Sequence, residues 1–272
     1  MRSRNAPLAR LTEPWRRATA ARRTLPDFMI IGAARAGTTS LYVYLAQHPD
    51  VRVPVRKEIN FFDQRFALGP DWYRAQFPLG GAGRRWKTGE ATPYYLHHPR
   101  VPERVRETVP DVRLVVLLRD PVERAFSHYR LLVRRTKENR SFAQIVDEEL
   151  TMIERTGGLV ADDADNRRTK REYAIVDRGR YAEQLERWLA VFPRDQLLVL
   201  RSEVLFGDPV RTYARALEFV GLAPFGDADF RARNASTPAT MDDGVRERLT
   251  AFYAPSNQRV RELVGIDLEA SS

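Results

Sequence analysis

A loop bounded by two glycines is the first segment of this sequence that could do chemistry. Gly32 and Gly37 are separated by four residues and stand between an apolar run at residues 28–31 and a stretch with helical spacing at residues 38–45. This order predicts a strand, a loop and a helix, with backbone N–H groups converging on an anion at the helix N-terminus. The residues that we expect to bind a phosphate here are Arg35, Ala36, Gly37, Thr38, Thr39 and Ser40.

The residue after the second glycine indicates what kind of phosphate the loop would bind. In a Walker A loop this residue is a lysine that reaches the β- and γ-phosphates of a nucleoside triphosphate, whereas here it is Thr38. The positive side chain lies inside the loop instead, at Arg35. A cation in that place suits one phosphate and the charge on its leaving group better than a magnesium-bridged triphosphate.

A second arginine stands where another buried strand is predicted to end. Residues 112–118 form a mostly apolar run, Arg119 follows it directly, and Ser127 lies eight residues further on in a predicted helix at residues 122–135. Ligands of open α/β sheets bind outside the carboxyl ends of the strands, and an arginine there donates charge-assisted hydrogen bonds to phosphate. Position and charge therefore make Arg119 a candidate for binding a second anion, although an arginine at a strand end also commonly forms a surface ion pair.

Together, these two patterns resemble those of the sulfotransferases, especially the branch of heparan-sulfate N- and O-sulfotransferases and its bacterial relatives. The resemblance runs from about residue 26 to residue 265. It implies that the loop binds the 5′-phosphate of 3′-phosphoadenylyl sulfate (PAPS), that Arg119 and Ser127 bind the 3′-phosphate, and that adenosine 3′,5′-bisphosphate is the product, with no metal required. Lysine is usual in the family at the position of Arg35, and arginine keeps the charge there but presents a planar fork.

The same resemblance assigns catalytic residues. Sulfuryl transfer needs a base for the proton of the acceptor and positive charge beside the leaving phosphate. The segment at residues 56–63 resembles the Lys-Glu-x-x-Phe-Phe segment of the heparan-type branch, in which the glutamate is the base, and Glu58 matches that position. Arg35 would serve the leaving group. Lys57 would either pair with Glu58 or contact the donor sulfate, and the sequence does not choose between them.

Two further segments are similar to parts of the family that contact substrates. Residues 90–95 resemble a segment in which a lysine often follows the glutamate, although this chain has Ala91 there, and we expect Thr92, Tyr94 and His97 to line the acceptor cleft. Arg233 falls where the family has a basic loop around the 3′-phosphate, but the glycine of that loop is absent. The heparan-type enzymes also carry a disulfide just before this loop, which a chain without cysteine must replace by packing.

These residues require elements that alternate along the chain. Strands are predicted at residues 28–31, 86–90, 112–118 and 196–200, and helices at 38–45, 122–135, 142–153, 181–192 and 242–264. Alternation of this kind predicts a single α/β domain with a central parallel sheet flanked by helices, similar to the P-loop nucleotide kinases. We expect a basic N-terminal arm at residues 1–25, mobile or loosely docked, and the sulfotransferase domain at residues 26–268.

Composition narrows the function less than the motifs do. The chain has 272 residues, a formal net charge of +9 and no cysteine. The positive charge fits polyanionic partners or a general bias toward arginine, and the basic arm is a candidate for peripheral membrane contact. The absence of cysteine fits a reducing compartment or indifference to redox state. With no apolar run of signal-peptide or membrane-span length in the sequence, we expect a cytoplasmic location.

Two alternatives belong to other classes of protein. A P-loop small-molecule kinase would need the lysine that Thr38 replaces. A nucleic-acid-binding protein would fit the charge, but the sequence has no helix-turn-helix, zinc or RNP pattern, so no nucleic-acid partner is expected. The expected acceptor is a hydroxyl or amine of a small molecule or glycan, with a carbohydrate or glycolipid favoured by the resemblance.

Overall fold

A computed structural model describes residues 12–81, 83–158, 174–231 and 240–268 of the chain. Its centre is a four-stranded parallel sheet in the order β2-β1-β3-β4. The strands are β1 (Phe28–Gly32), β2 (Gly89–Ala91), β3 (Arg113–Leu118) and β4 (Leu197–Arg201). The predicted single α/β domain with a parallel sheet is confirmed, and three of the four strands lie within a residue or two of their predicted bounds. The strand predicted at residues 86–90 is shorter and ends one residue later.

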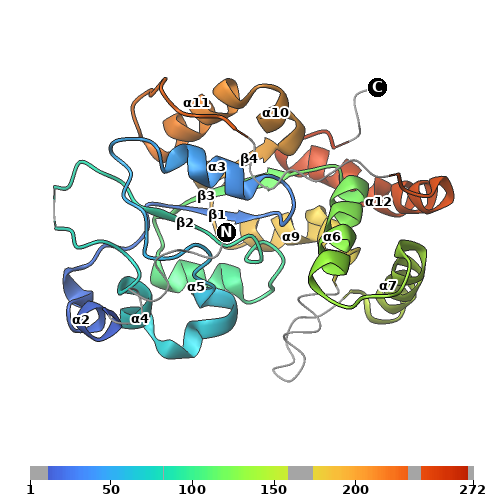
Figure 1. Cartoon of the computed structure of the whole chain (residues 1–272), viewed down its shortest axis with the longest axis horizontal. Coiled ribbons are helices and arrows are strands. Elements are labelled where there is room, and N and C mark those ends of the chain that lie inside the picture. The colour runs from blue at the N-terminus through green and yellow to red at the C-terminus, as the bar shows by residue number, and fades with distance from the viewer. Residues whose placement is uncertain (1–11, 82, 159–173, 232–239, 269–272) are drawn as a thin grey trace.

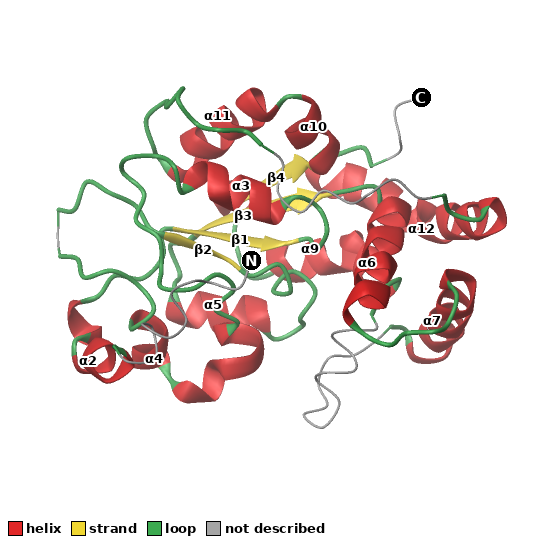
Figure 2. Ribbon diagram, in the orientation of Figure 1, coloured by secondary structure: helices red, strands yellow, loops and turns green. Residues whose placement is uncertain are grey.

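Helices cover both faces of this sheet. Figure 1 shows α3, α10 and α11 over one face and α5 with α9 over the other, while α6, α7 and α12 gather beyond the end of the sheet; the same layers appear by secondary structure in Figure 2. The helices of the described residues are α2 (Glu13–Ala18), α3 (Thr38–Leu45), α4 (Pro70–Arg74), α5 (Val101–Thr108), α6 (Pro121–Arg135), α7 (Phe142–Thr156), α9 (Tyr181–Leu189), α10 (Ser202–Gly207), α11 (Pro209–Val220) and α12 (Asp243–Val264).

Local signals explain where several helices begin. The Asp120 side chain accepts a hydrogen bond from the backbone N–H of Glu123 and is followed by a proline at the first position of α6. Ser141 and Gln144 form a reciprocal capping box at the start of α7. Such caps satisfy N–H groups that have no partner within the helix and contribute about 1 kcal/mol each. The cap at Asp120 also fixes the direction in which α6 leaves the end of β3.

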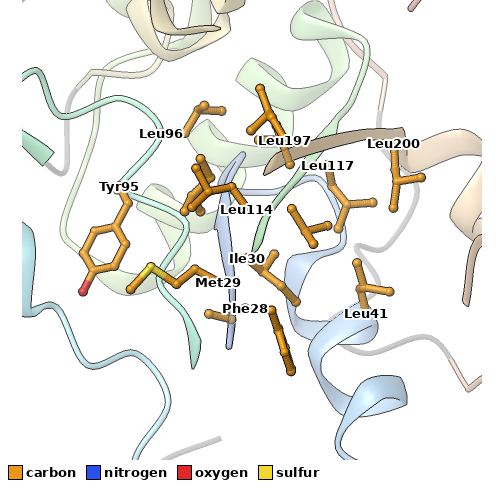
Figure 3. Close-up of a cluster of buried hydrophobic side chains, with 14 of the residues drawn as sticks. Phe28, Met29, Ile30, Leu41, Tyr95, Leu96, Leu114, Leu117, Leu197 and Leu200 are labelled. Carbon is orange, nitrogen blue, oxygen red and sulfur yellow. The ribbon is translucent and has the colours of Figure 1, made fainter. Parts of the chain in front are cut away.

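The core lies between the sheet and its helices. All five residues of β1 and the last five of β3 are buried, as expected for parallel strands covered on both faces. Figure 3 shows Phe28, Met29 and Ile30 of β1 packed among leucines of β3, β4 and α3. Complete burial of one such side chain contributes roughly 1.5–3 kcal/mol, so the sheet is a rigid support for the loops at its carboxyl edge.

Residues 12–25 of the expected N-terminal arm are docked on the rest of the domain. Arg16 Nε donates to the carbonyl oxygen of Ala75 at 2.6 Å, and Arg23 Nη1 donates to that of Phe77 at 2.8 Å. Trp72 Nε1 donates to Glu13 Oε1 at 3.1 Å. These bonds attach α2 to α4 and the turn after it, because carbonyl groups at a helix end need donors from outside the helix. Residues 1–11 lie outside the described part of the chain.

A second, smaller core joins α6, α7 and α12 to residues 174–179. Three elements hold that segment: the Glu149 carboxylate on α7 accepts the backbone N–H groups of Ile175 and Val176 at 2.6 and 2.5 Å, Tyr253 Oη on α12 donates to the carbonyl oxygen of Val176 at 2.7 Å, and Arg124 on α6 donates to that of Ile175.

No helix of the described residues is long and apolar enough to cross a membrane.

Candidate active site

The glycine-bounded loop connects β1 to α3 at the carboxyl edge of the sheet. The backbone N–H of Ala33 donates to the carbonyl oxygen of Leu117 at 2.7 Å, which ties the loop to the neighbouring strand β3. Gly37 has φ of 89°, and a Cβ atom placed on it would lie 2.9 Å from Leu205 Cδ2. Position 37 therefore requires glycine both for its left-handed backbone and for its close approach to α10.

The first turn of α3 follows directly. Thr38 and Ser40 are buried, and the N-cap residue Gly37 has no side chain with which to cap this helix. The first backbone N–H groups of a helix carry a partial positive charge and bind anions when no protein group satisfies them. Residues 35–40 thus form the loop and helix start that the sequence predicts, and phosphate binding there stays a prediction.

Arg35 and Ser127 bring the two predicted anion sites together. Arg35 has a positive φ of 74°, and its Nε donates to Ser127 Oγ at 3.1 Å. Arg119 Nη1 lies 3.5 Å from the carbonyl oxygen of Arg35, and Tyr181 Oη donates to the carbonyl oxygen of Arg119 at 3.1 Å. Because β1 and β3 are neighbours in the sheet, the loop after one strand meets the helix after the other.

Electrostatics at this edge favour an anion. Burial and, after it, the positive charges of Arg134, Arg119, Arg135 and Arg124 together lower the pKa of the Arg35 guanidinium to about 10. A half-buried guanidinium among other guanidinium groups is unfavourable unless negative charge balances it. A phosphate-bearing ligand would supply that charge, so these residues fit the donor that the sequence implies.

Lys57 and Glu58 lie beside the same loop. Lys57 Nζ donates to Thr39 Oγ1 at 3.1 Å and is 3.9 Å from Glu58 Oε1. Burial lowers the pKa of Lys57, and the charge of Glu58 opposes that shift. The lysine is within ion-pair distance of Glu58 and also contacts the loop through Thr39. Its contact with a donor sulfate stays a prediction.

The backbone beyond Glu58 turns sharply. Asn60 has φ of 54°, and its Nδ2 donates to the carbonyl oxygen of Glu58 at 3.1 Å. The π-helix η2 (Phe61–Arg65) begins immediately after it. Phe61 stacks on Tyr73 with ring centroids 4.6 Å apart, which anchors this end of the segment in the core.

The three predicted acceptor residues differ in their surroundings. Thr92 is fully buried, and its hydroxyl donates to Glu90 Oε2 at 2.8 Å. Tyr94 lies under the Arg178 guanidinium, 4.8 Å from the ring centroid. His97 Nε2 is 3.5 Å from Asp177 Oδ2, and burial, followed by the nearby Arg178 charge, holds the pKa of His97 well below its usual value. All three side chains are buried. Tyr94 and His97 lie against residues 177–178, whereas Thr92 belongs to the network around Glu90.

Sequence reasoning missed part of this site. Arg124, Asp177 and Arg178 are buried, and their positions follow from the packing of α6 against residues 174–179. Arg124 lies between Arg119 and Ser127 in the predicted helix, but its spacing gave no signal for this position. Arg233 lies outside the described residues. Within the described ranges, no group of three or more histidine, aspartate or glutamate side chains could hold a metal ion.

The fold is that of an α/β protein, and the residues expected to bind phosphate lie at the carboxyl edge of its parallel sheet. Residues 25–233 match the family model described as a sulfotransferase domain. The chain therefore belongs to the sulfotransferase family, and the prediction of a sulfotransferase-type enzyme is confirmed at the level of the family.

Individual relatives agree with that assignment. Heparan sulfate glucosamine 3-O-sulfotransferase 6 of Mus musculus is 30% identical over 90% of this chain and 74% of its own length. A crystal structure of a sulfotransferase from Alicyclobacillus acidocaldarius superposes with a TM-score of 0.74 and 32% identity, over 90% of this chain and 98% of that one. The membrane-associated sulfotransferase kil1 of Dictyostelium discoideum is 25% identical over 90% of this chain.

The relatives are longer than this chain, and one of them bears on its predicted location. The chain spans 66% of the length of kil1 and 65% of that of human heparan sulfate glucosamine 3-O-sulfotransferase 3B1, which is 32% identical over 90% of this chain. The expected cytoplasmic location is contradicted, because a relative that matches most of this chain is named as membrane-associated.

Proposed function

We propose that the chain transfers a sulfuryl group from PAPS to a hydroxyl or amine of an acceptor. The observation that carries this proposal is the contact between Arg35 and Ser127, 3.1 Å from Nε to Oγ. It joins a cradle for one phosphate to the residues expected to bind another. A donor with phosphates on both sides of its ribose matches two adjacent anion sites, and a linear triphosphate does not.

Each half of the site has its own part in donor binding. Residues 35–40 hold the 5′-phosphate through backbone N–H groups and the Arg35 guanidinium. Arg119 and Ser127 hold the 3′-phosphate, with Arg233 as a further ligand for it. The proposed domain comprises residues 26–268, and transfer requires no metal.

The chemistry follows from charges at the edge of the cradle. Glu58 takes the proton from the acceptor as its oxygen or nitrogen forms a bond to sulfur. The bond from sulfur to the bridging phosphate oxygen breaks in line, and its electron pair stays on adenosine 3′,5′-bisphosphate. Arg35 and Lys57 offset that negative charge. Since Ala91 replaces the lysine that often assists in the family, Lys57 provides the second cation.

The acceptor is proposed to be a carbohydrate or glycolipid. Support comes from the relatives named as heparan sulfate glucosamine sulfotransferases. Tyr94 and His97 are only 9% and 7% exposed, so in this proposal they support the acceptor side from beneath, beside Arg178 and Asp177. Thr92 lies deeper in the interior. A screen of glycans, glycolipids and phenols with labelled PAPS identifies the class of acceptor.

Donor binding is tested without knowledge of the acceptor. Adenosine 3′,5′-bisphosphate should raise the melting temperature in the absence of Mg²⁺, by a shift that grows with its concentration. No shift with this ligand, together with a clear shift for Mg-ATP, would contradict the proposal in favour of a kinase. Retention on DNA without PAPS-dependent activity would instead indicate nucleic-acid binding.

The role of Glu58 is tested by Glu58→Gln. The variant should keep the melting-temperature shift with adenosine 3′,5′-bisphosphate and lose transfer, because an amide binds no proton at neutral pH. Full activity in Glu58→Gln would exclude this residue as the base.

A further inference from the structure

β2 carries a buried carboxylate, Glu90, whose side chain lies near the segment that carries the proposed base. Glu90 is 1% exposed, and three hydroxyl groups surround it. Tyr73 Oη donates to Glu90 Oε1 at 2.6 Å, Thr92 Oγ1 donates to Oε2 at 2.8 Å, and Tyr95 Oη lies 3.4 Å from Oε2. Burying a carboxylate is costly unless its hydrogen bonds are satisfied, so the donor set indicates a specific use for this group.

Two of these hydroxyl groups also accept hydrogen bonds from the turn after Glu58. The backbone N–H of Phe61 donates to Tyr95 Oη at 2.9 Å, and that of Asn60 to Thr92 Oγ1 at 3.5 Å. A hydroxyl that donates to the carboxylate presents its lone pairs to such N–H groups. Glu90 thereby orients both hydroxyls toward the same two backbone groups.

The turn held in this way has a backbone conformation that needs support. Asn60 has φ of 54°, a left-handed conformation that a residue with a side chain keeps only when its surroundings enforce it. The same residue donates from Nδ2 to the carbonyl oxygen of Glu58 at 3.1 Å. The conformation of Asn60 therefore fixes the backbone at Glu58.

We propose that Glu90 is a positioning residue for transfer, holding Glu58 at the donor cradle through Thr92, Tyr95 and the turn at Asn60. The proposal rests on the proposed function, in which Glu58 is the base. Glu90 itself contacts neither donor nor acceptor in this scheme, and its effect reaches the reaction through hydrogen bonds alone.

Protonation of Glu90 should make the hydrogen bonds that hold the turn at Asn60 depend on pH. Burial and the charge of Asp63 on η2 raise the pKa of Glu90, hydrogen bonds from Tyr73, Thr92 and Tyr95 lower it, and the net value is about 7. The ionised carboxylate accepts from all three hydroxyls. Once protonated, it must donate from one oxygen, so one hydroxyl loses its acceptor and the turn loosens.

The first test compares Tyr95→Phe and Thr92→Val with Tyr73→Phe at pH 8.5. The first two variants remove an acceptor for the turn, and each should lower kcat about tenfold while the donor KM and the melting-temperature shift with adenosine 3′,5′-bisphosphate stay unchanged. Tyr73 contacts Glu90 but has no hydrogen bond to the turn, so Tyr73→Phe should keep kcat within about threefold. Equal kcat in all three variants would overturn the proposal.

The pH profile of kcat is the second readout, and general destabilisation would not reproduce it. The wild-type profile should fall on the acid side near pH 7, and this limb should be absent in Glu90→Gln, which cannot ionise. Tyr73→Phe removes a hydrogen bond that favours the ionised form, so its limb should move to higher pH. An unchanged acid limb in both variants would overturn the proposal.

Hydrogen exchange separates failure of this proposal from failure of the proposed function. The Phe61 amide should exchange faster in Tyr95→Phe than in wild type or Tyr73→Phe, whether or not any acceptor is sulfated. If no sulfuryl transfer is found but exchange changes as expected, the function fails and the structural link stands. If transfer is found and Phe61 exchange is the same in all variants, the positioning role is wrong.

Discussion

Arg35 Nε donates a hydrogen bond to Ser127 Oγ at 3.1 Å, although 92 residues separate the two side chains. One follows β1 and the other lies on the helix that follows β3. The contact joins the loop after β1 to α6, which carries the second sequence pattern. Ligand binding by either of these two parts should therefore depend on the other. The same contact places the Arg35 guanidinium within the field of four other arginines.

The two ends of β3 provide a matched pair of arginines for testing donor binding. Arg119 follows the carboxyl end of the strand, and Arg113 begins its amino end, where it is exposed. Arg119→Ala should weaken the affinity for adenosine 3′,5′-bisphosphate about 10- to 100-fold, the cost of a lost charge-assisted hydrogen bond. Arg113→Ala should leave it unchanged. Titration calorimetry measures both, and equal affinities would place the 3′-phosphate elsewhere.

Gly37 and Gly265 form a second matched pair. Both have positive φ, 89° and 70°, but a Cβ on Gly37 would crowd Leu205, whereas nothing lies within 4 Å of one on Gly265. Each alanine variant should lose about 1 kcal/mol of unfolding free energy from backbone strain. Gly37→Ala should lose more and should also weaken donor binding. Urea unfolding and calorimetry distinguish the two effects, and identical losses would mean that the approach of α10 to the loop is unimportant.

The parts of the fold that the sequence predicted are those encoded by short contiguous patterns. Apolar runs predicted β1, β3 and β4 because strands buried on both faces have no polar alternation. The strand at β2 was placed less well, because Lys87, the second residue of the predicted strand, precedes β2 and pairs with Asp27. The adjacency of Arg35 and Ser127 also followed from a rule, since carboxyl ends of parallel strands share one edge.

The rest of the site depends on packing between distant elements. Thr92 was expected at the acceptor cleft but lies inside, because residues 92–98 follow no strand periodicity from which the direction of a side chain could be read. Arg178 was missed because its place over Tyr94 depends on how Glu149, Tyr253 and Arg124 hold its segment. No local sequence signal records such contacts.

Glu149 should make stability depend on pH. Burial raises the pKa of Glu149 to about 7, against hydrogen bonds from three backbone N–H groups that lower it. The folded state therefore binds more protons than the unfolded state between about pH 4.5 and 7. This group's contribution to stability, about 3 kcal/mol, is present at low pH and is lost as the pH rises through 7.

The comparison of Glu149→Gln with Glu148→Gln isolates that effect. Glu148 is the preceding residue of α7, and its side chain is 55% exposed. Between pH 5 and pH 8, urea unfolding should show wild type and Glu148→Gln losing about 3 kcal/mol more than Glu149→Gln does. Contributions from other groups, including His97, cancel in this difference. The same pH dependence in both variants would show that Glu149 does not titrate in this range.

Lys57 should give donor binding an alkaline limit. Burial lowers its pKa, so as the pH rises it loses its proton before an exposed lysine would, and an uncharged amine no longer attracts the leaving phosphate. The affinity for adenosine 3′,5′-bisphosphate should therefore decline at high pH in wild type. Lys57→Arg should remove most of this decline, because arginine stays charged.

Lys87→Arg is the control for this experiment. Lys87 is a partly exposed lysine, 3.7 Å from Asp27 near the amino ends of the strands, and its replacement should leave the pH dependence of binding unaltered. Calorimetry in buffers of different ionisation enthalpy adds a direct check, since wild type should take up protons on binding at alkaline pH and Lys57→Arg should take up fewer. Equal proton uptake by wild type and Lys57→Arg would show that Lys57 does not offset the negative charge of the leaving phosphate. Arg35 would then be the residue that does so.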